Sequence, residues 1–132
     1  MVSDKLDYEA ELCLVIGRKC KHVPRDRAHE VIAGYFCGND VSVRDWQIRV
    51  PTFQIGKSFD THGPMGPYLV TPDEVDDPHN LAIRCTVNGE ERQNSNTKHL
   101  IFDCMMRSRI SPSHLPSTLV MSCLWEPPVA LA

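Results

Sequence analysis

Three acidic residues carry the most informative chemistry in this chain. Glu9 and Glu11 lie two positions apart in a run typical of a β-strand, and Asp40 ends a second such run. Side chains at positions i and i+2 point to the same face of a strand, so the carboxylates of Glu9 and Glu11 project together. Two carboxylates on a sheltered face repel each other and are costly to desolvate, and a bound cation relieves both effects. An all-oxygen site suits Mg²⁺, Mn²⁺ or Ca²⁺ better than Zn²⁺. The alternative is that both glutamates lie on the solvent side of an amphipathic strand.

Arg44 follows Asp40 by four positions, and Gln47 follows it by seven. If this segment turns helically, all three side chains lie on one face. Arg44 then binds or neutralises a substrate carboxylate while Gln47 donates a hydrogen bond. The alternative for Arg44 is a structural salt bridge, for instance to Asp45.

The elements that position these residues are short. Residues 7–17 alternate and then become apolar, which predicts a strand entering a core, and residues 34–39 predict a second strand that delivers Asp40. Residues 26–32 predict a short helix with Asp26 as its N-cap. Residues 42–48 predict a helical turn, and Asn88-Gly89 predicts a hairpin between strands at 81–87 and 90–93.

Length supports one domain, and the strand-rich periodicity indicates a mixed β or α+β class. A chain of 132 residues has no room for a second core of ordinary size. The net charge of −3 and the absence of a basic stripe argue against a nucleic-acid partner. No apolar run reaches the roughly 18–20 residues that span a bilayer, so no membrane partner is expected. The six cysteines show no CxxC spacing and are expected to be free buried thiols in a reducing cytosol.

Six separated strings resemble the fumarylacetoacetate hydrolase family, in order, over roughly residues 3–103. Such an ordered series is far more specific than one short pattern. The strings are Asp7-Tyr8-Glu9-Ala10-Glu11-Leu12, residues 34–47 with Asn39-Asp40-Val41-Ser42-Val43-Arg44-Asp45-Trp46-Gln47, Gly56-Lys57-Ser58-Phe59-Asp60-Thr61, Gly66-Pro67-Tyr68-Leu69-Val70, Asp77-Pro78-His79-Asn80-Leu81, and residues 87–97.

The resemblance implies a strand-rich α+β fold, a mixed β-roll with the metal and substrate in its mouth, incomplete in this chain and usually a homodimer when complete. It implies Glu9, Glu11 and Asp40 as ligands of Mg²⁺, or of Mn²⁺ or Ca²⁺. It places Lys57 where it stabilises developing negative charge on the substrate, and it places Thr61 at the substrate carboxylate.

The implied function is that of a divalent-metal-dependent hydrolase or lyase acting on β-diketo or 2-oxo acids. Acylpyruvate-type C–C cleavage, decarboxylation and isomerisation all pass through an enolate that the metal stabilises, so the ligands do not distinguish them. The alternative is a catalytically inactive fragment that at most binds metal or pairs with intact family subunits. Family members usually carry a His and Glu pair on an upstream lid helix, and this pair is absent here. A cytoplasmic location is expected, or a mitochondrial one in a eukaryote.

The segment 104–132 departs from the family pattern. Of the 17 acidic residues, 16 precede position 104 and only Glu126 follows it. No helix or strand period persists there. Reading across codon boundaries from His114 onward permits Asp-Pro-Gly-Asp-Val followed by Gly-Thr-Pro, which the family carries at this point. We therefore predict two segments: a partial catalytic domain at 1–103 and a frame-shifted tail at 104–132.

Overall fold

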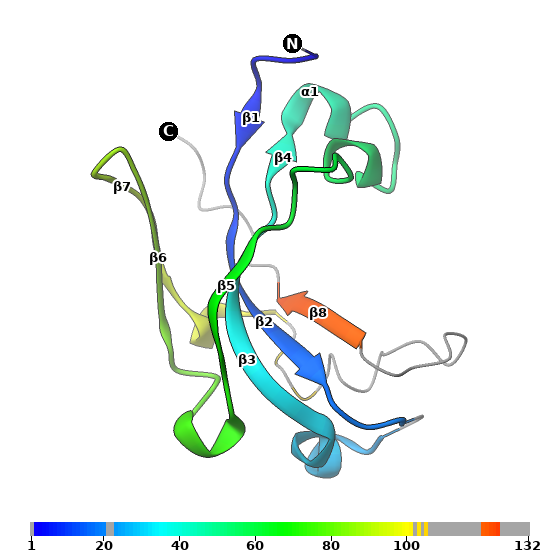
Figure 1. Ribbon diagram of the computed structural model, residues 1–132, viewed down its shortest axis with the longest axis vertical. Coiled ribbons are helices and arrows are strands. Elements are labelled where there is room, and N and C mark those ends of the chain that lie inside the picture. Colours follow the sequence, from blue (N-terminus) through cyan, green and yellow to red (C-terminus); the bar gives the residue numbers. More distant parts are fainter. Residues whose placement is uncertain (1, 21–22, 102, 104, 106–119, 125–132) are drawn as a thin grey trace.

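A four-stranded antiparallel sheet forms the centre of the molecule. The computed structural model describes residues 2–20, 23–101, 103, 105 and 120–124. The strand order is β5-β3-β2-β8, and the sheet curves strongly along β3 and β2 (Figure 1). The strands are β2 (Ala10–Ile16), β3 (Ile32–Asn39), β5 (Met65–Val70) and β8 (Val120–Leu124).

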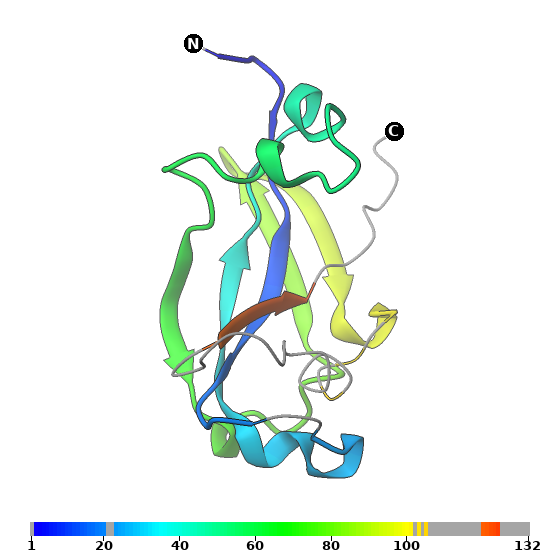
Figure 2. The same cartoon turned by 90° about the vertical axis from the view of Figure 1, so that its right-hand side faces the viewer.

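Two smaller two-stranded sheets flank the central one. The first pairs β1 (Leu6–Asp7) with β4 (Ser42–Val43), and the second is the hairpin of β6 (Ala82–Val87) and β7 (Glu90–Asn96). Two views show β1, β4 and α1 gathered at one end of the molecule, with the hairpin beside the central sheet (Figures 1 and 2). The hairpin turn has positive φ at Asn88 (54°) and Gly89 (85°), which an Asn-Gly pair tolerates. The predicted hairpin is confirmed, and β7 is longer than expected.

The helices are all short. The helix α1 spans Arg44–Gln47, so residues 42–48 are a strand followed by a helical turn. The predicted helix at 26–32 is a 3₁₀ segment, and its N-cap is Pro24 rather than Asp26, which lies in the first turn. The 3₁₀ segments are Arg25–Val31, Gln54–Gly56, Pro72–Glu74 and Thr97–His99.

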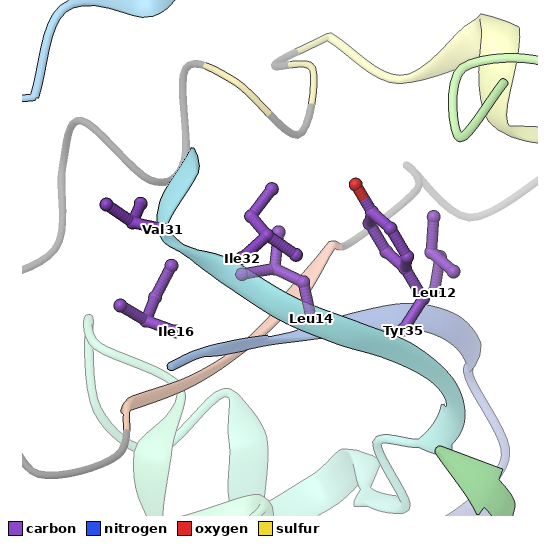
Figure 3. Packing of buried hydrophobic residues seen from close by; sticks show 6 residues of the cluster. All are labelled: Leu12, Leu14, Ile16, Val31, Ile32 and Tyr35. Atoms are coloured by element: carbon purple, nitrogen blue, oxygen red, sulfur yellow. The ribbon is translucent and has the colours of Figure 1, made fainter. Parts of the chain in front are cut away.

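The strand β2 is buried on both faces. Leu12, Leu14 and Ile16 alternate along it and pack with residues at the start of β3 to form the main apolar cluster (Figure 3). The opposite face of the same segment carries the alternating series Glu9, Glu11 and Cys13, all of them buried. The alternative of solvent-side glutamates is therefore wrong, because this segment has no solvent side. The cluster consists of Leu12, Leu14, Ile16, Val31, Ile32 and Tyr35.

Two expectations from the sequence are wrong. Cys13 is disulfide-bonded rather than free, and β2 places the backbone of Cys123 opposite it in register. Cys20, Cys37 and Cys85 are free thiols, but Cys37 is exposed. Cys104 lies outside the described residues. The tail sequence shows no persistent strand period, yet β8 pairs with β2 from Leu12 to Ile16. The described residues contain no helix of the length and apolarity that crossing a bilayer requires.

Candidate functional site

The backbone at the start of β2 brings Glu9 and Asp40 together. In the antiparallel pairing of β2 with β3, Ala10 lies opposite Asn39. The Asn39 side-chain Oδ1 accepts the Glu9 N–H at 2.9 Å, and the Asp40 N–H donates to the Glu9 carbonyl at 2.9 Å. Asp40 therefore leaves the end of β3 directly beside Glu9, and Glu11 follows on the same face.

The three predicted ligands form one cluster. One carboxylate oxygen from each of Glu9, Glu11 and Asp40 lies within 4.8 Å of the others. Glu9 and Glu11 are 9% and 3% exposed, which keeps bulk water away from two of the three charges. Three converging carboxylates with this burial are a donor set of the kind that binds a hard divalent cation.

Lys57 joins the cluster from the loop after the 3₁₀ segment Gln54–Gly56. Its Nζ donates to Glu9 Oε2 at 2.8 Å, to Asp40 Oδ2 at 2.5 Å and to Ser42 Oγ at 2.8 Å. Burial by itself lowers the pKa of Lys57, but the hydrogen bonds to Asp40 and Glu9 outweigh it, so the pKa lies above its usual value. The side chain is an ammonium ion at neutral pH.

Arg44 fixes the other oxygen of Glu9. Its Nη1 donates to Glu9 Oε1 at 2.6 Å, and its Nε donates to Asp7 Oδ2 at 2.8 Å. Burial opposes the charged guanidinium, but these two carboxylates raise the pKa of Arg44 above its usual value. A salt bridge was predicted with Asp45 as one alternative; the structure has it with Asp7 and Glu9 instead, and Asp45 accepts a hydrogen bond from Ser3 at 2.6 Å.

The remaining predicted residues differ in how close they lie to Arg44 and to the three carboxylates. Gln47 Oε1 accepts a hydrogen bond from Arg44 Nη1 at 2.9 Å, so the two share a face of α1 as expected. Asp40 joins them from the end of β3, not from the same helix. Thr61 is exposed, and its Oγ1 lies 3.5 Å from His62 Nδ1. Among the described contacts, none ties Thr61 to the three carboxylates.

The charges of the site fit a divalent cation. Among the described residues, the ion pairs and the acidic cluster bring together four carboxylates and two basic side chains, and these six groups carry an excess of two formal negative charges in a partly buried space. A cation of charge +2 balances this excess with oxygen ligands only. The carboxylates are those of Asp7, Glu9, Glu11 and Asp40, and the basic groups are those of Arg44 and Lys57.

Several residues of the site were not predicted from the sequence. Asp7 holds Arg44, Asn39 holds the Glu9 backbone and Ser42 contacts Lys57. Each lies within the quoted motifs, but nothing in local spacing indicates its partner. Gln93, from β7, bonds to the backbone of Ala10 across 83 positions of sequence, and no local pattern signals such a contact.

Comparisons with known proteins assign the chain to a family. The model of the fumarylacetoacetate (FAA) hydrolase C-terminal region matches residues 1–107. The chain belongs to this family. It is 50% identical over 102 residues to the mitochondrial oxaloacetate tautomerase fahd2 of Xenopus laevis, and that match covers 76% of this chain and 32% of the relative. The mitochondrial oxaloacetate tautomerase FAHD2A of Homo sapiens is also 50% identical, with the same coverage.

Solved family structures share the fold. The 5-carboxymethyl-2-hydroxymuconate delta-isomerase from Mycobacterium smegmatis superposes with a TM-score of 0.85 at 36% identity, covering 96% of this chain and 50% of that one. The fumarylpyruvate hydrolase from Pseudomonas aeruginosa, in complex with Mn²⁺ and pyruvate, gives 0.76 at 34% identity, covering 83% and 48%. The strand-rich α+β fold expected from the sequence is confirmed. The chain spans about a third of the length of the curated relatives named above.

Proposed function

We propose that this chain carries the divalent-metal centre of an enzyme that converts small 2-oxo or β-diketo acids through an enolate. The observation that carries the proposal is the convergence of Glu9, Glu11 and Asp40 within 4.8 Å in a largely buried site. Oxaloacetate is the first candidate substrate, since two relatives at 50% identity are named oxaloacetate tautomerases. Isomerisation is therefore favoured over C–C cleavage and decarboxylation.

The roles of the side chains follow from their positions. Glu9, Glu11 and Asp40 would hold the cation, which when bound supplies Lewis-acid polarisation of a substrate carbonyl. Lys57 directs its ammonium group at the same oxygens, where it stabilises negative charge that develops on the substrate. The burial of Glu9 and Glu11 limits access of water and strengthens these charge interactions.

The substrate carboxylate would be recognised at the α1 side of the site. Arg44 is 29% exposed while bound to Asp7, Glu9 and Gln47, so part of its guanidinium would be accessible to a substrate anion. Gln47 lies beside it and would supply a hydrogen bond. Thr61 would contact the same carboxylate from the loop that follows Lys57.

Other features of the proposal rest on the relatives. Mg²⁺ is the metal we propose for the cell, with Mn²⁺ as the working probe because a family structure holds it. The two named tautomerases are mitochondrial, which favours that compartment over the cytoplasm if the source is eukaryotic. We also propose that the complete family protein is a homodimer.

The test measures metal binding and turnover separately on the full chain. Calorimetric titration with Mn²⁺ gives the affinity, and ultraviolet absorbance follows keto–enol interconversion of oxaloacetate. Replacing a residue that only hydrogen-bonds to a metal ligand typically lowers metal affinity by about 10–100-fold. Glu11 is proposed to bind the metal directly, so we expect Glu11→Gln to lower Mn²⁺ affinity by at least about 100-fold. Glu74→Gln, at an exposed position far along the chain, is the matched control.

The outcomes separate the proposal from its rival. Mn²⁺ binding with turnover that Glu11→Gln abolishes supports the enzyme. Mn²⁺ binding without turnover supports the alternative, a non-catalytic fragment. If the chain is folded but does not bind Mn²⁺, the proposed metal centre is refuted.

A further inference from the structure

The side-chain amide of Gln93 makes the two backbone hydrogen bonds that a residue of a neighbouring strand would make. The Ala10 N–H donates to Gln93 Oε1 at 2.9 Å, and Gln93 Nε2 donates to the Ala10 carbonyl at 2.8 Å. One amide group thus satisfies both main-chain groups of one residue, with near-ideal distances for each bond. We name this pair of bonds the Gln93 clamp.

The clamp acts at the residue between two proposed metal ligands. Ala10 separates Glu9 from Glu11, so the orientation of its two peptide groups sets where both carboxylates point. Within the residues that the structure describes, the pairing of β2 with β8 extends from Leu12 to Ile16. The opposite edge of β2 pairs with β3. Gln93 therefore bonds the backbone of β2 at Ala10, two residues before the described pairing with β8 begins at Leu12.

A bulge in the hairpin presents Gln93 to Ala10. The register shifts so that Cys85 lies opposite Gln93 while Thr86 lies opposite Glu91, which leaves Arg92 as the extra residue. Such bulges turn a strand and change the direction of neighbouring side chains. The Arg92 carbonyl itself accepts a hydrogen bond from the Tyr8 hydroxyl at 3.3 Å, which is a second attachment of the hairpin beside Glu9.

We propose that Gln93 is a positioning residue for the metal centre: by clamping Ala10 it holds the carboxylates of Glu9 and Glu11 in the geometry that binds a divalent cation. The proposal rests on the metal centre put forward above. Gln93 is not a ligand, since its oxygen and nitrogen are both committed to the Ala10 backbone. Its contribution to the centre is to make the site rigid before the cation binds.

The experiment compares three variants of the full chain by titration with Mn²⁺. Gln93→Met keeps the length of the side chain but removes both hydrogen bonds. Gln93→Asn keeps the amide but is one methylene too short to span both atoms. Asn94→Leu is the matched control, because Asn94 is the exposed neighbour on the other face of β7 and its amide bonds only to Glu91 among the described contacts. Hydrogen exchange at the Ala10 amide reports the clamp directly.

We expect Gln93→Met and Gln93→Asn to bind Mn²⁺ about 10- to 100-fold more weakly, with faster exchange at the Ala10 amide. We expect Asn94→Leu to stay within about twofold of the parent chain, as surface substitutions usually do. Saturating Mn²⁺ should restore turnover in the Gln93 variants, which loss of a catalytic group would not allow. Hydrogen exchange in the metal-free variants separates a local change at Ala10 from a general loss of structure. If Gln93→Met does not fold, Gln93→Asn provides the measurement.

The results distinguish this proposal from the proposed function. Parent-like affinity in both Gln93 variants, or a deficit that saturating Mn²⁺ does not correct, overturns the positioning role while the enzyme proposal stands. Weaker binding in the variants of a chain that shows no turnover supports the positioning role and refutes the enzyme. A parent chain that does not bind Mn²⁺ overturns both.

Discussion

At the scale of single residues, Lys57 contacts the same oxygens that a divalent cation would bind under the proposed function. The ammonium nitrogen lies 2.8 Å from Glu9 Oε2 and 2.5 Å from Asp40 Oδ2, within the proposed ligand set. It balances part of the negative charge there, and it must yield some of this contact when a cation binds. The same lysine is proposed to stabilise charge on the substrate. Its effect on the cation is measured by Mn²⁺ affinity, and its effect on the substrate is measured by turnover.

We expect Lys57→Met to bind Mn²⁺ at least about tenfold more tightly than the parent chain, because removing one positive charge near three carboxylates raises the attraction for a cation. Turnover should fall at least about 100-fold, as for loss of a charge-stabilising donor. Calorimetry and the oxaloacetate assay measure the two quantities. Lys98→Met, at an exposed position, is the control and should change neither. Weaker Mn²⁺ binding in Lys57→Met would contradict the competition.

The residue types of the site were predictable, but their partners were not. The strand alternation placed Glu9 and Glu11 on one face, and the structure confirms this shared, buried face. The helical spacing predicted the Arg44–Gln47 contact, and the two do share α1. The same spacing assigned Asp40 to that face for the wrong reason, since β3 delivers it. Asp7 was missed as the partner of Arg44 because the two meet only through the pairing of β1 with β4.

At the scale of elements, Gly56 allows the Lys57 loop to approach α1. A Cβ atom at Gly56 would lie 2.5 Å from the Gln47 nitrogen and 2.8 Å from the Val43 carbonyl oxygen. Both are backbone atoms, which cannot move aside as a flexible side chain would. The absence of a side chain at this buried position therefore sets how close Lys57 comes to the carboxylates.

We expect Gly56→Ala to lower the free energy of unfolding by about 1–3 kcal/mol, the usual cost of overpacking a buried position. The displaced loop should also reduce turnover, while Mn²⁺ affinity stays the same or rises, because Lys57 competes with the cation for carboxylate oxygens and is not a metal ligand. Chemical denaturation and the two assays measure these effects. Thr52→Ala, on an exposed part of the same segment, should stay within about 0.5 kcal/mol. An unchanged stability in Gly56→Ala would contradict the close packing.

Local patterns predicted the elements better than their ends. The strands predicted at 7–17 and 34–39 are observed as β2 (Ala10–Ile16) and β3 (Ile32–Asn39), and the predicted hairpin forms around the Asn-Gly turn. The segment after Pro24 is a 3₁₀ helix, and Ile32, which was predicted as its last residue, already has extended backbone. Tertiary packing decides such boundaries, and no local pattern encodes it.

At the scale of the whole molecule, the tail remains the main open prediction. The strand β8 pairs with β2, but main-chain hydrogen bonds form with any non-proline side chain, so this pairing is compatible with either reading frame. We propose that residues from about 104 are translated out of the family frame. The family match that ends at residue 107 lies close to this point.

Sequencing the gene from upstream of Met1 through codon 132, beside its transcript, tests the frame. We expect one inserted or missing base whose correction restores the Asp-Pro-Gly-Asp-Val and Gly-Thr-Pro segments. A clean reading that encodes this tail, repeated without a slip in related genomic copies, would refute the proposal. In that case residues 104–132 are a genuine departure from the family.

The contacts that build the site have a consequence for folding kinetics. They join residues far apart in the chain: 35 positions for Arg44 and Glu9, 48 for Lys57 and Glu9, and 83 for Gln93 and Ala10. Contacts of such separation close long loops, so we expect them to form late on the folding pathway. Interactions absent from the transition state change the unfolding rate and leave the folding rate nearly unaltered. Saturating Mn²⁺ should therefore slow unfolding in stopped-flow denaturant jumps while refolding stays within about twofold, and the ion would prolong the lifetime of the native state without hastening its formation.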